Sequence, residues 1–295
     1  MRKVKQVLFG DMVMMGDTPV RQPLPTMKVE QIDPFLLLHH HTTEIEAGTR
    51  ENDAGVGPHP HRGFSPVTFI YQGSLHHRDS RGNSSVVRAG GVQWTDVGMG
   101  IVHSERPDID LVTNGGTMEI IQLWVNTPQK HKMDQPLYQP FGESQLPALT
   151  PDKGEANIRL VAGEQDGQKG PVQTKLPVLS LMGEFKAGSA KTFEVPAGMH
   201  SFLYLLSGSV RVHGHGLVEE HNMVVFEEGT EPIGIDATAA TRFLFMAGMP
   251  LKEPLATYGP FVMNTQSEIM EAMRDYQMGR MGFLVEEFEG ATSES

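Results

Sequence analysis

The chain has 295 residues, of which 39% are hydrophobic, enough for the cores of two ordinary domains and too many for wholesale disorder. Its net charge of −12 argues against direct nucleic-acid binding, which needs a basic surface, but leaves open binding to a DNA-bound protein. Cysteine is absent, which excludes disulfides and thiolate metal sites and fits a reducing compartment.

The amino-terminal segment predicts neither a secretory signal nor a membrane span. The apolar stretch at residues 7–10 is too short for the hydrophobic region of a signal peptide. No run of about eighteen apolar residues occurs anywhere in the chain. We therefore expect a cytoplasmic protein with no membrane partner.

Short segments rich in β-branched and aromatic residues follow one another through the first half. They are residues 35–38, 67–71, 75–79, 85–88, 92–95, 101–105 and 118–125, separated by turns that contain glycine. Strands at this spacing predict an all-β fold built as a small barrel or jelly roll. The histidine run at residues 39–41 is compatible with an auxiliary metal site or a pocket wall, but we favour a solvated strand end.

The second half repeats this pattern after a proline-rich linker at residues 128–151. Residues 202–206, followed by Ser207 and Gly208, resemble residues 67–71, followed by Gln72 and Gly73. Residues 223–226 resemble residues 92–95 in the same way. The repeat predicts two tandem barrels, which we place at residues 1–134 and 135–295.

One helix is expected near the carboxyl end, at residues 265–279. Thr265 and Glu268 have the spacing of a capping box. Ile269, Met273 and Tyr276 share one face, and Gly279 ends the periodic pattern. The acidic stretch at residues 286–295 is expected to be a frayed tail.

Two short pairs of polar residues suggest a metal site: His59 with His61, and His103 with Glu105. Residues i and i+2 of a strand point to the same face, so each pair presents two side chains in one direction. If both strands face one pocket, three imidazoles and one carboxylate converge. This set suits iron, manganese, nickel, copper, cobalt or zinc, whereas scattered surface residues are the alternative.

The remaining histidines lack a partner at the right spacing for a metal site. His76 and His77 are adjacent in a predicted strand and therefore face opposite ways, so one of them points inward. We expect that one to be packed or hydrogen-bonded. His213 and His215 lie beside glycines and predict an exposed turn.

The two pairs lie in longer motifs that resemble those of the pirin family. His59-Pro-His-Arg-Gly-Phe64 resembles the first cupin motif in its pirin form, and residues 91–105, GVQWTDVGMGIVHSE, resemble the second. Residues 123–126 and 259–265 are also similar to pirin segments, and the resemblance runs from about residue 35 to residue 283. It implies a bicupin with one mononuclear metal, usually iron(II), held by His59, His61, His103 and Glu105.

The sequence departs from the family pattern at two places. Many pirins carry glutamate after the first motif, where this chain has Ser65-Pro66, and this change could alter the surroundings of the metal without abolishing its binding. The family also tends to have acidic residues where this chain has the histidines at 39–41.

The second barrel lacks the ligand pattern. Aligning the repeats places Glu194 and Pro196 where the first barrel has His59 and His61, and no His-x-Glu follows Phe226. We therefore predict one metal ion per chain.

The resemblance implies two kinds of function. Some bacterial pirins are quercetin dioxygenases, which implies a small aromatic substrate and O2. For such a substrate we expect Glu105, if it loosens from the metal, to act as general base, and Phe64, Phe69 and Trp94 to form apolar pocket walls. The mammalian member is described as a nuclear, iron-dependent transcription coregulator, which implies a redox-sensing protein that acts through a protein partner. A purely structural metal that stabilises the barrel is a third reading.

Overall fold

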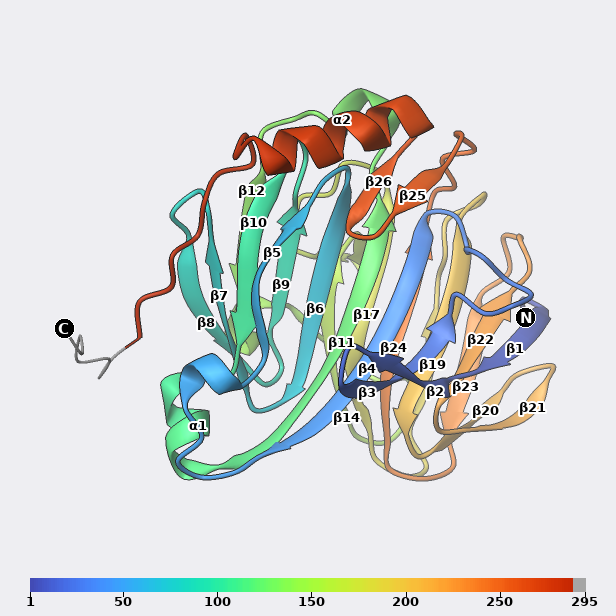
Figure 1. The fold of residues 1–295 in the computed structure, drawn as a ribbon. Coiled ribbons are helices and arrows are strands. Elements are labelled where there is room, and N and C mark those ends of the chain that lie inside the picture. Colours follow the sequence, from blue (N-terminus) through green and yellow to red (C-terminus); the bar gives the residue numbers. More distant parts are fainter. Residues whose placement is uncertain (289–295) are drawn as a thin grey trace. The chain divides into compact units, whose positions relative to one another are not determined.

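The computed structural model describes residues 1–288 and shows an almost all-β protein, which confirms the predicted fold class (Figure 1). The chain divides into two compact units, each assembled from separated segments. The histidine unit comprises Thr42–Ile120, Thr127–Pro140 and the residues from Glu253 onward, and the companion unit comprises Met1–His41, Ile121–Asn126 and Phe141–Lys252. In the described part of the chain, no helix is long and apolar enough to span a membrane.

The histidine unit contains two sets of antiparallel strands. One sheet has the strand order β5-β10-β7-β8, and the other contributes the run β12-β9-β6-β11. The strands are β5 (Val56–His61), β6 (Phe64–Gln72), β7 (Ser74–Asp79), β8 (Ser84–Arg88), β9 (Val92–Asp96), β10 (Ile101–Arg106), β11 (Gly116–Asn126) and β12 (Leu137–Phe141). Strand β11 and strand β4 (Phe35–Ile45) each place residues in both units.

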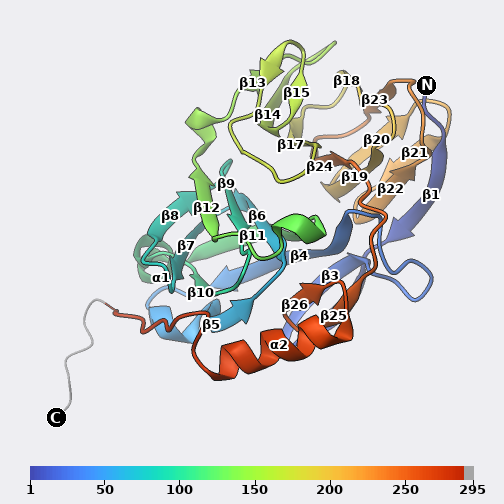
Figure 2. The same cartoon turned by 90° about the horizontal axis from the view of Figure 1, so that it is seen from above.

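Short helices and a carboxyl-terminal hairpin complete the histidine unit. These elements are η1 (Glu51–Asp53), α1 (Ile109–Asn114), η2 (Gln129–His131), β25 (Ala256–Tyr258), β26 (Phe261–Met263) and α2 (Gln266–Gln277). Both views place α2 beside β5 and β26 (Figure 1, Figure 2). Ile269 and Ala272 of α2 are buried in one apolar cluster with Val102 of β10 and Phe261 of β26. The carboxyl-terminal hairpin and α2 therefore pack on β10, which carries the second metal motif.

The companion unit has a large sheet of order β1-β22-β19-β24-β17-β14-β13 and a smaller one of order β18-β23-β20-β21. Its elements are β1 (Val4–Phe9), β2 (Asp11–Met15), β3 (Thr18–Leu24), η3 (Glu143–Gln145), β13 (Ala148–Leu149), β14 (Ala156–Ala162), β15 (Glu164–Gln165), β16 (Gln168–Lys169), β17 (Val178–Phe185), β18 (Ala190–Phe193), β19 (His200–Ser207), β20 (Ser209–Val212), β21 (Gly216–Glu219), β22 (Asn222–Phe226), β23 (Ile233–Ala237) and β24 (Thr241–Gly248). Buried apolar side chains from both sheets, such as Leu203, Val210 and Phe245, form one core.

The predicted internal repeat has a structural counterpart in strand pairing. Strand β6 pairs antiparallel with β9, and Val67 lies opposite Trp94. Strand β19 pairs antiparallel with β22 in the same manner, and Phe202 lies opposite Val225. The two sequence segments that resemble each other thus form equivalent strand pairs.

The predicted carboxyl-terminal helix is present as α2. Thr265 Oγ1 accepts a hydrogen bond from the Glu268 backbone, and the Glu268 side chain accepts one from the Thr265 backbone, which is the predicted capping box. The predicted apolar face is wrong at Tyr276, which is 41% exposed, because Ile269 and Ala272 form the buried face instead. Helix α1 carries no strong periodic signal in its six residues and was not predicted.

The predicted division between residues 134 and 135 falls inside the segment Thr127–Pro140 of the histidine unit. The domain division remains a prediction, because each compact unit is assembled from segments that alternate along the sequence. Within the predicted tail, residues 289–295 lie outside the described residues.

The expectation of a solvated strand end at residues 39–41 is wrong. Strand β4 continues to Ile45, and His39, His40 and His41 are all buried. His39 Nε2 lies 2.8 Å from Gln22 Oε1, and His40 Nδ1 lies 3.0 Å from the Tyr204 hydroxyl. Burial lowers the pKa of His39 and of His41 to about 4, so both are neutral imidazoles near pH 7.

Candidate metal centre

The two predicted pairs lie on neighbouring antiparallel strands of one sheet. His59 and His61 are on β5, His103 and Glu105 are on β10, and His103 lies directly opposite His59. Side chains of residues that face each other across a ladder point to the same side of the sheet. The alternation expected from sequence therefore holds in each strand, and the pairing brings the two strands together.

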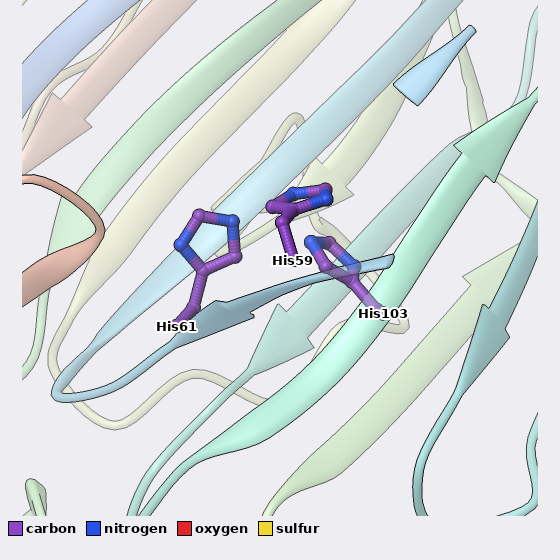
Figure 3. A group of neighbouring side chains, drawn as sticks. All are labelled: His59, His61 and His103. Carbon is purple, nitrogen blue, oxygen red and sulfur yellow. The ribbon is translucent and has the colours of Figure 1, made fainter. Parts of the chain in front are cut away.

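The three histidine rings gather at one point on this face (Figure 3). Their ring centroids are 4.8 Å apart for His59 and His61, 4.4 Å for His59 and His103, and 4.9 Å for His61 and His103. One ligand nitrogen from each ring lies within 4.8 Å of the other two. In the described part of the chain, this is the only group of three or more His, Cys, Asp or Glu side chains with metal-binding proximity.

Hydrogen bonds on the outer sides of two rings prepare the inner nitrogens for ligation. His59 Nδ1 donates to the Gly57 carbonyl at 2.8 Å, and His61 Nδ1 donates to the Pro260 carbonyl at 3.3 Å. A donor role for Nδ1 makes Nε2 the lone-pair nitrogen, which is the usual arrangement of a metal-ligating histidine. Both ring nitrogens of His103 are buried without a hydrogen-bond partner among the described residues. A buried imidazole rarely lacks any polar partner, so the set fits a divalent metal ion.

Burial also holds two of the imidazoles in the neutral form. Burial lowers the pKa of His61 and that of His103 well below the ordinary value, and the neighbouring imidazoles lower both further. For His61, the hydrogen bond to the Pro260 carbonyl acts in the opposite direction. Neutral imidazole is the form that binds a metal, so this part of the site is ready for ligation at neutral pH.

Glu105 is buried on the same strand as His103 but is not part of the compact histidine group. Its Oε1 accepts a hydrogen bond of 2.8 Å from the Thr68 hydroxyl of β6. The strand register of β10 against β5 shifts between His103 and Glu105. Against β7 on its other side, β10 keeps a regular register from His103 to Arg106. His103 and Glu105 therefore share a face of β10, and the role of Glu105 as a ligand remains a proposal.

His77 is the inward-facing member of its pair, and it is hydrogen-bonded as predicted. It is 1% exposed, and its Nε2 lies 3.1 Å from Asp79 Oδ2. Its ring lies 5.3 Å from that of His103 and stacks on the Tyr138 ring at 3.9 Å between centroids. Sequence reasoning missed Tyr138, which comes from β12 and has no motif. Burial raises the pKa of the Tyr138 hydroxyl. This hydroxyl shares a hydrogen bond of 2.7 Å with the Ser85 hydroxyl.

The predicted aromatic walls divide between two faces of β6 and β9. Phe64 packs edge-on against the His61 ring with centroids 5.2 Å apart. The prediction is wrong for Phe69 and Trp94, because strand alternation places both on the face opposite to Thr68. Ser65, at the departure from the pirin pattern, donates to Asp96 Oδ1 at 2.6 Å. By the same alternation, Ser65 lies on the face of β6 opposite to Thr68.

In the companion unit, the positions that align with His59 and His61 carry no histidine. Glu194 and Pro196 are exposed, and the interior of that unit is filled by apolar side chains. His213 is paired with Asp236 at 2.9 Å, and His215 is exposed in the following turn. The prediction of a single metal ion per chain is compatible with these placements.

Comparison with known proteins matches both halves of the chain to one family. The Pirin family model matches residues 17–125, and the model of the Pirin C-terminal cupin domain matches residues 181–282. A Pirin-like protein of Solanum lycopersicum is 35% identical over 90% of this chain and 87% of its own length. Human Pirin is 33% identical over 90% of this chain and 88% of its own length.

A solved structure agrees with this assignment. The crystal structure of a quercetin 2,3-dioxygenase from Acinetobacter baumannii is 34% identical and superposes with a TM-score of 0.89, covering 97% of this chain and 100% of that one. The predicted bicupin fold and the resemblance drawn from the HPHRGF and GIVHSE motifs are therefore confirmed. The chain belongs to the pirin family.

Proposed function

We propose that this protein is a metal-dependent dioxygenase that cleaves quercetin or a related flavonol with O2. The observation that carries the proposal is the compact group of His59, His61 and His103, with two rings oriented by backbone carbonyls. We assign Glu105 as the fourth ligand and iron(II) as the metal, with manganese, nickel, copper, cobalt and zinc as alternatives. The similarity to a protein solved as a quercetin 2,3-dioxygenase supports the choice of substrate class.

The residues around the metal position would each contribute to the reaction. A bound divalent metal would act as a Lewis acid and lower the pKa of a coordinated flavonol hydroxyl. Glu105, once free of the metal, would accept the hydroxyl proton at its carboxylate, while Thr68 holds Oε1 and fixes the orientation of the group. Phe64 packs against His61 and keeps water from that side of the ring. In the net reaction, O2 is incorporated and the ring opens with release of carbon monoxide.

The deciding experiment is an oxygen-electrode assay with quercetin on protein reconstituted with Fe²⁺. We expect oxygen uptake with equimolar carbon monoxide, and loss of both in His61→Ala. His76→Ala is the matched control, because His76 lies next to His77 in β7 but bonds Ser84 on the outer side. It should keep the wild-type rate. An iron-loaded protein that consumes no oxygen with any flavonol would refute the proposal.

A further inference from the structure

Arg62, in the first metal motif, is hydrogen-bonded both to the second motif and to helix α2. It follows His61 in sequence and is only 3% exposed, although it carries a charge. Its Nε donates to the Met99 carbonyl at 2.7 Å, in the loop that leads to β10 and His103. Its Nη2 donates at 3.0 Å to Asp275 Oδ2 of α2, a residue 213 positions away. One buried guanidinium therefore joins β5, the β10 approach and α2.

The backbone of Arg62 is joined to the same carboxyl-terminal segment. Its N–H donates to the Pro260 carbonyl at 3.4 Å, and its carbonyl accepts from Val262 at 3.0 Å. The Pro260 carbonyl also receives the Nδ1–H of His61. The orientation of the His61 ring thus depends on where the hairpin of β25 and β26 sits.

A buried lysine also links the turn after His61 to strand β26. Lys132 is 1% exposed and donates from Nζ to the Gly63 carbonyl at 2.6 Å and to the Val262 carbonyl at 3.0 Å. Gly63 has a φ of +87°, and a Cβ there would lie 2.0 Å from the Val262 oxygen. The turn after His61 and strand β26 are therefore held in close backbone contact, with little room to shift.

Asp275 makes two ion pairs of very different exposure. Its Oδ2 pairs with the buried Arg62, and its Oδ1 pairs at 2.8 Å with Arg280, which is 57% exposed. A buried charge that loses its partner is costly, whereas an exposed pair contributes little. The Arg62 bond is consequently the one that can hold α2 in place, and Arg280 offers an internal control on the same carboxylate.

We propose that Arg62 and Asp275 form a positioning pair that sets the orientation of the His61 imidazole, and through it the affinity and geometry of metal binding. The inference rests on the proposed metal site but not on dioxygenase chemistry. Removing a group that orients a metal ligand typically weakens metal binding by about 10- to 100-fold. A pair that only stabilises the fold would lower the melting temperature and leave the metal complex of the folded protein unchanged.

The test uses Co²⁺ as the probe, because its visible absorption reports coordination geometry. Co²⁺ affinity, measured against a competing chelator, and the Co²⁺ spectrum are compared for wild type, Asp275→Asn and Arg280→Gln, at a temperature where all three are folded by circular dichroism. We expect Asp275→Asn to lose about 10- to 100-fold in affinity with a shifted spectrum, and Arg280→Gln to stay within about twofold of wild type.

Arg62→Lys provides a second variant if Asp275→Asn does not fold. It keeps the charge but lacks the fork that reaches Met99 and Asp275 together, so the same loss is expected. Wild-type affinity and spectrum in the folded variant would overturn the proposal. Wild-type protein that binds Co²⁺ tightly but consumes no oxygen after iron loading would overturn only the proposed function.

Discussion

Replacing Thr68 by valine tests how strongly the surroundings of Glu105 govern the metal site. Valine keeps the shape of threonine and suits a strand, but it removes the donor of the 2.8 Å bond to Glu105 Oε1. Thr68 is 2% and Glu105 is 7% exposed, so solvent has little access to replace the hydroxyl. A lost hydrogen bond to a charged acceptor costs about 1.5–3 kcal/mol of folding stability. If Glu105 is a ligand, metal affinity should also fall by about 10- to 100-fold, which is about 1.4–2.7 kcal/mol.

Two measurements separate these effects. Urea unfolding of the apoprotein gives the stability change, and Co²⁺ competition titration gives the affinity change. Thr68→Ser keeps the hydroxyl and loses one methyl group, so its Co²⁺ affinity should remain near that of wild type. A Thr68→Val protein that is destabilised but binds Co²⁺ as tightly as wild type would show that Glu105 does not act at the metal. Equal losses in Thr68→Ser and Thr68→Val would assign the effect to packing instead of the hydroxyl.

Three further predictions concern pH, the core and metal content. At Asp108, burial acts to raise the carboxyl pKa, but hydrogen bonds from Ser74, Leu111 and Arg88 outweigh it and hold the pKa below its ordinary range. The stability that wild type has over Asp108→Asn should therefore be full above about pH 4 and shrink as the pH falls through the folded pKa, in urea titrations across that range. Phe193→Ala removes a fully buried ring stacked on Phe245 at 4.4 Å between centroids, and should cost about 3–5 kcal/mol in urea unfolding without changing metal content. Elemental analysis should find one tightly bound ion per chain in wild type and none in His103→Ala; two ions in wild type would contradict the single-site prediction.

The features that could be predicted from sequence are those governed by rules acting over a few residues. His59 and His61, and likewise His103 and Glu105, share a face because strand side chains alternate with a period of two. The Thr265 and Glu268 capping box acts across a single helical turn. The tandem barrels were visible because the same strand and turn signals occur twice along the chain. Each of these depends on local geometry that the order of residues carries directly.

The face on which a side chain lies and the length of a strand depend on which strands pair. Patterns over a few residues do not predict that pairing. Phe69 and Trp94 were expected near the metal because they are aromatic, but the register of β6 against β9 puts them on the face opposite to Thr68. The run at residues 39–41 was expected at a solvated end, but β4 extends further and its histidines are buried. The structure thus corrects the predictions from sequence where strand pairing decides the face of a side chain or the length of a strand.

By itself, the sequence determined the fold class, the family and the histidines of the site, because these follow from spacing within short motifs. Only the tertiary structure decided what surrounds them. Tyr138 reaches His77 from β12, Lys132 joins Gly63 to Val262, and Asp275 meets Arg62 across 213 positions of sequence. Such contacts have no local signal, because they form only when packing brings remote segments together and burial makes each polar group find a partner.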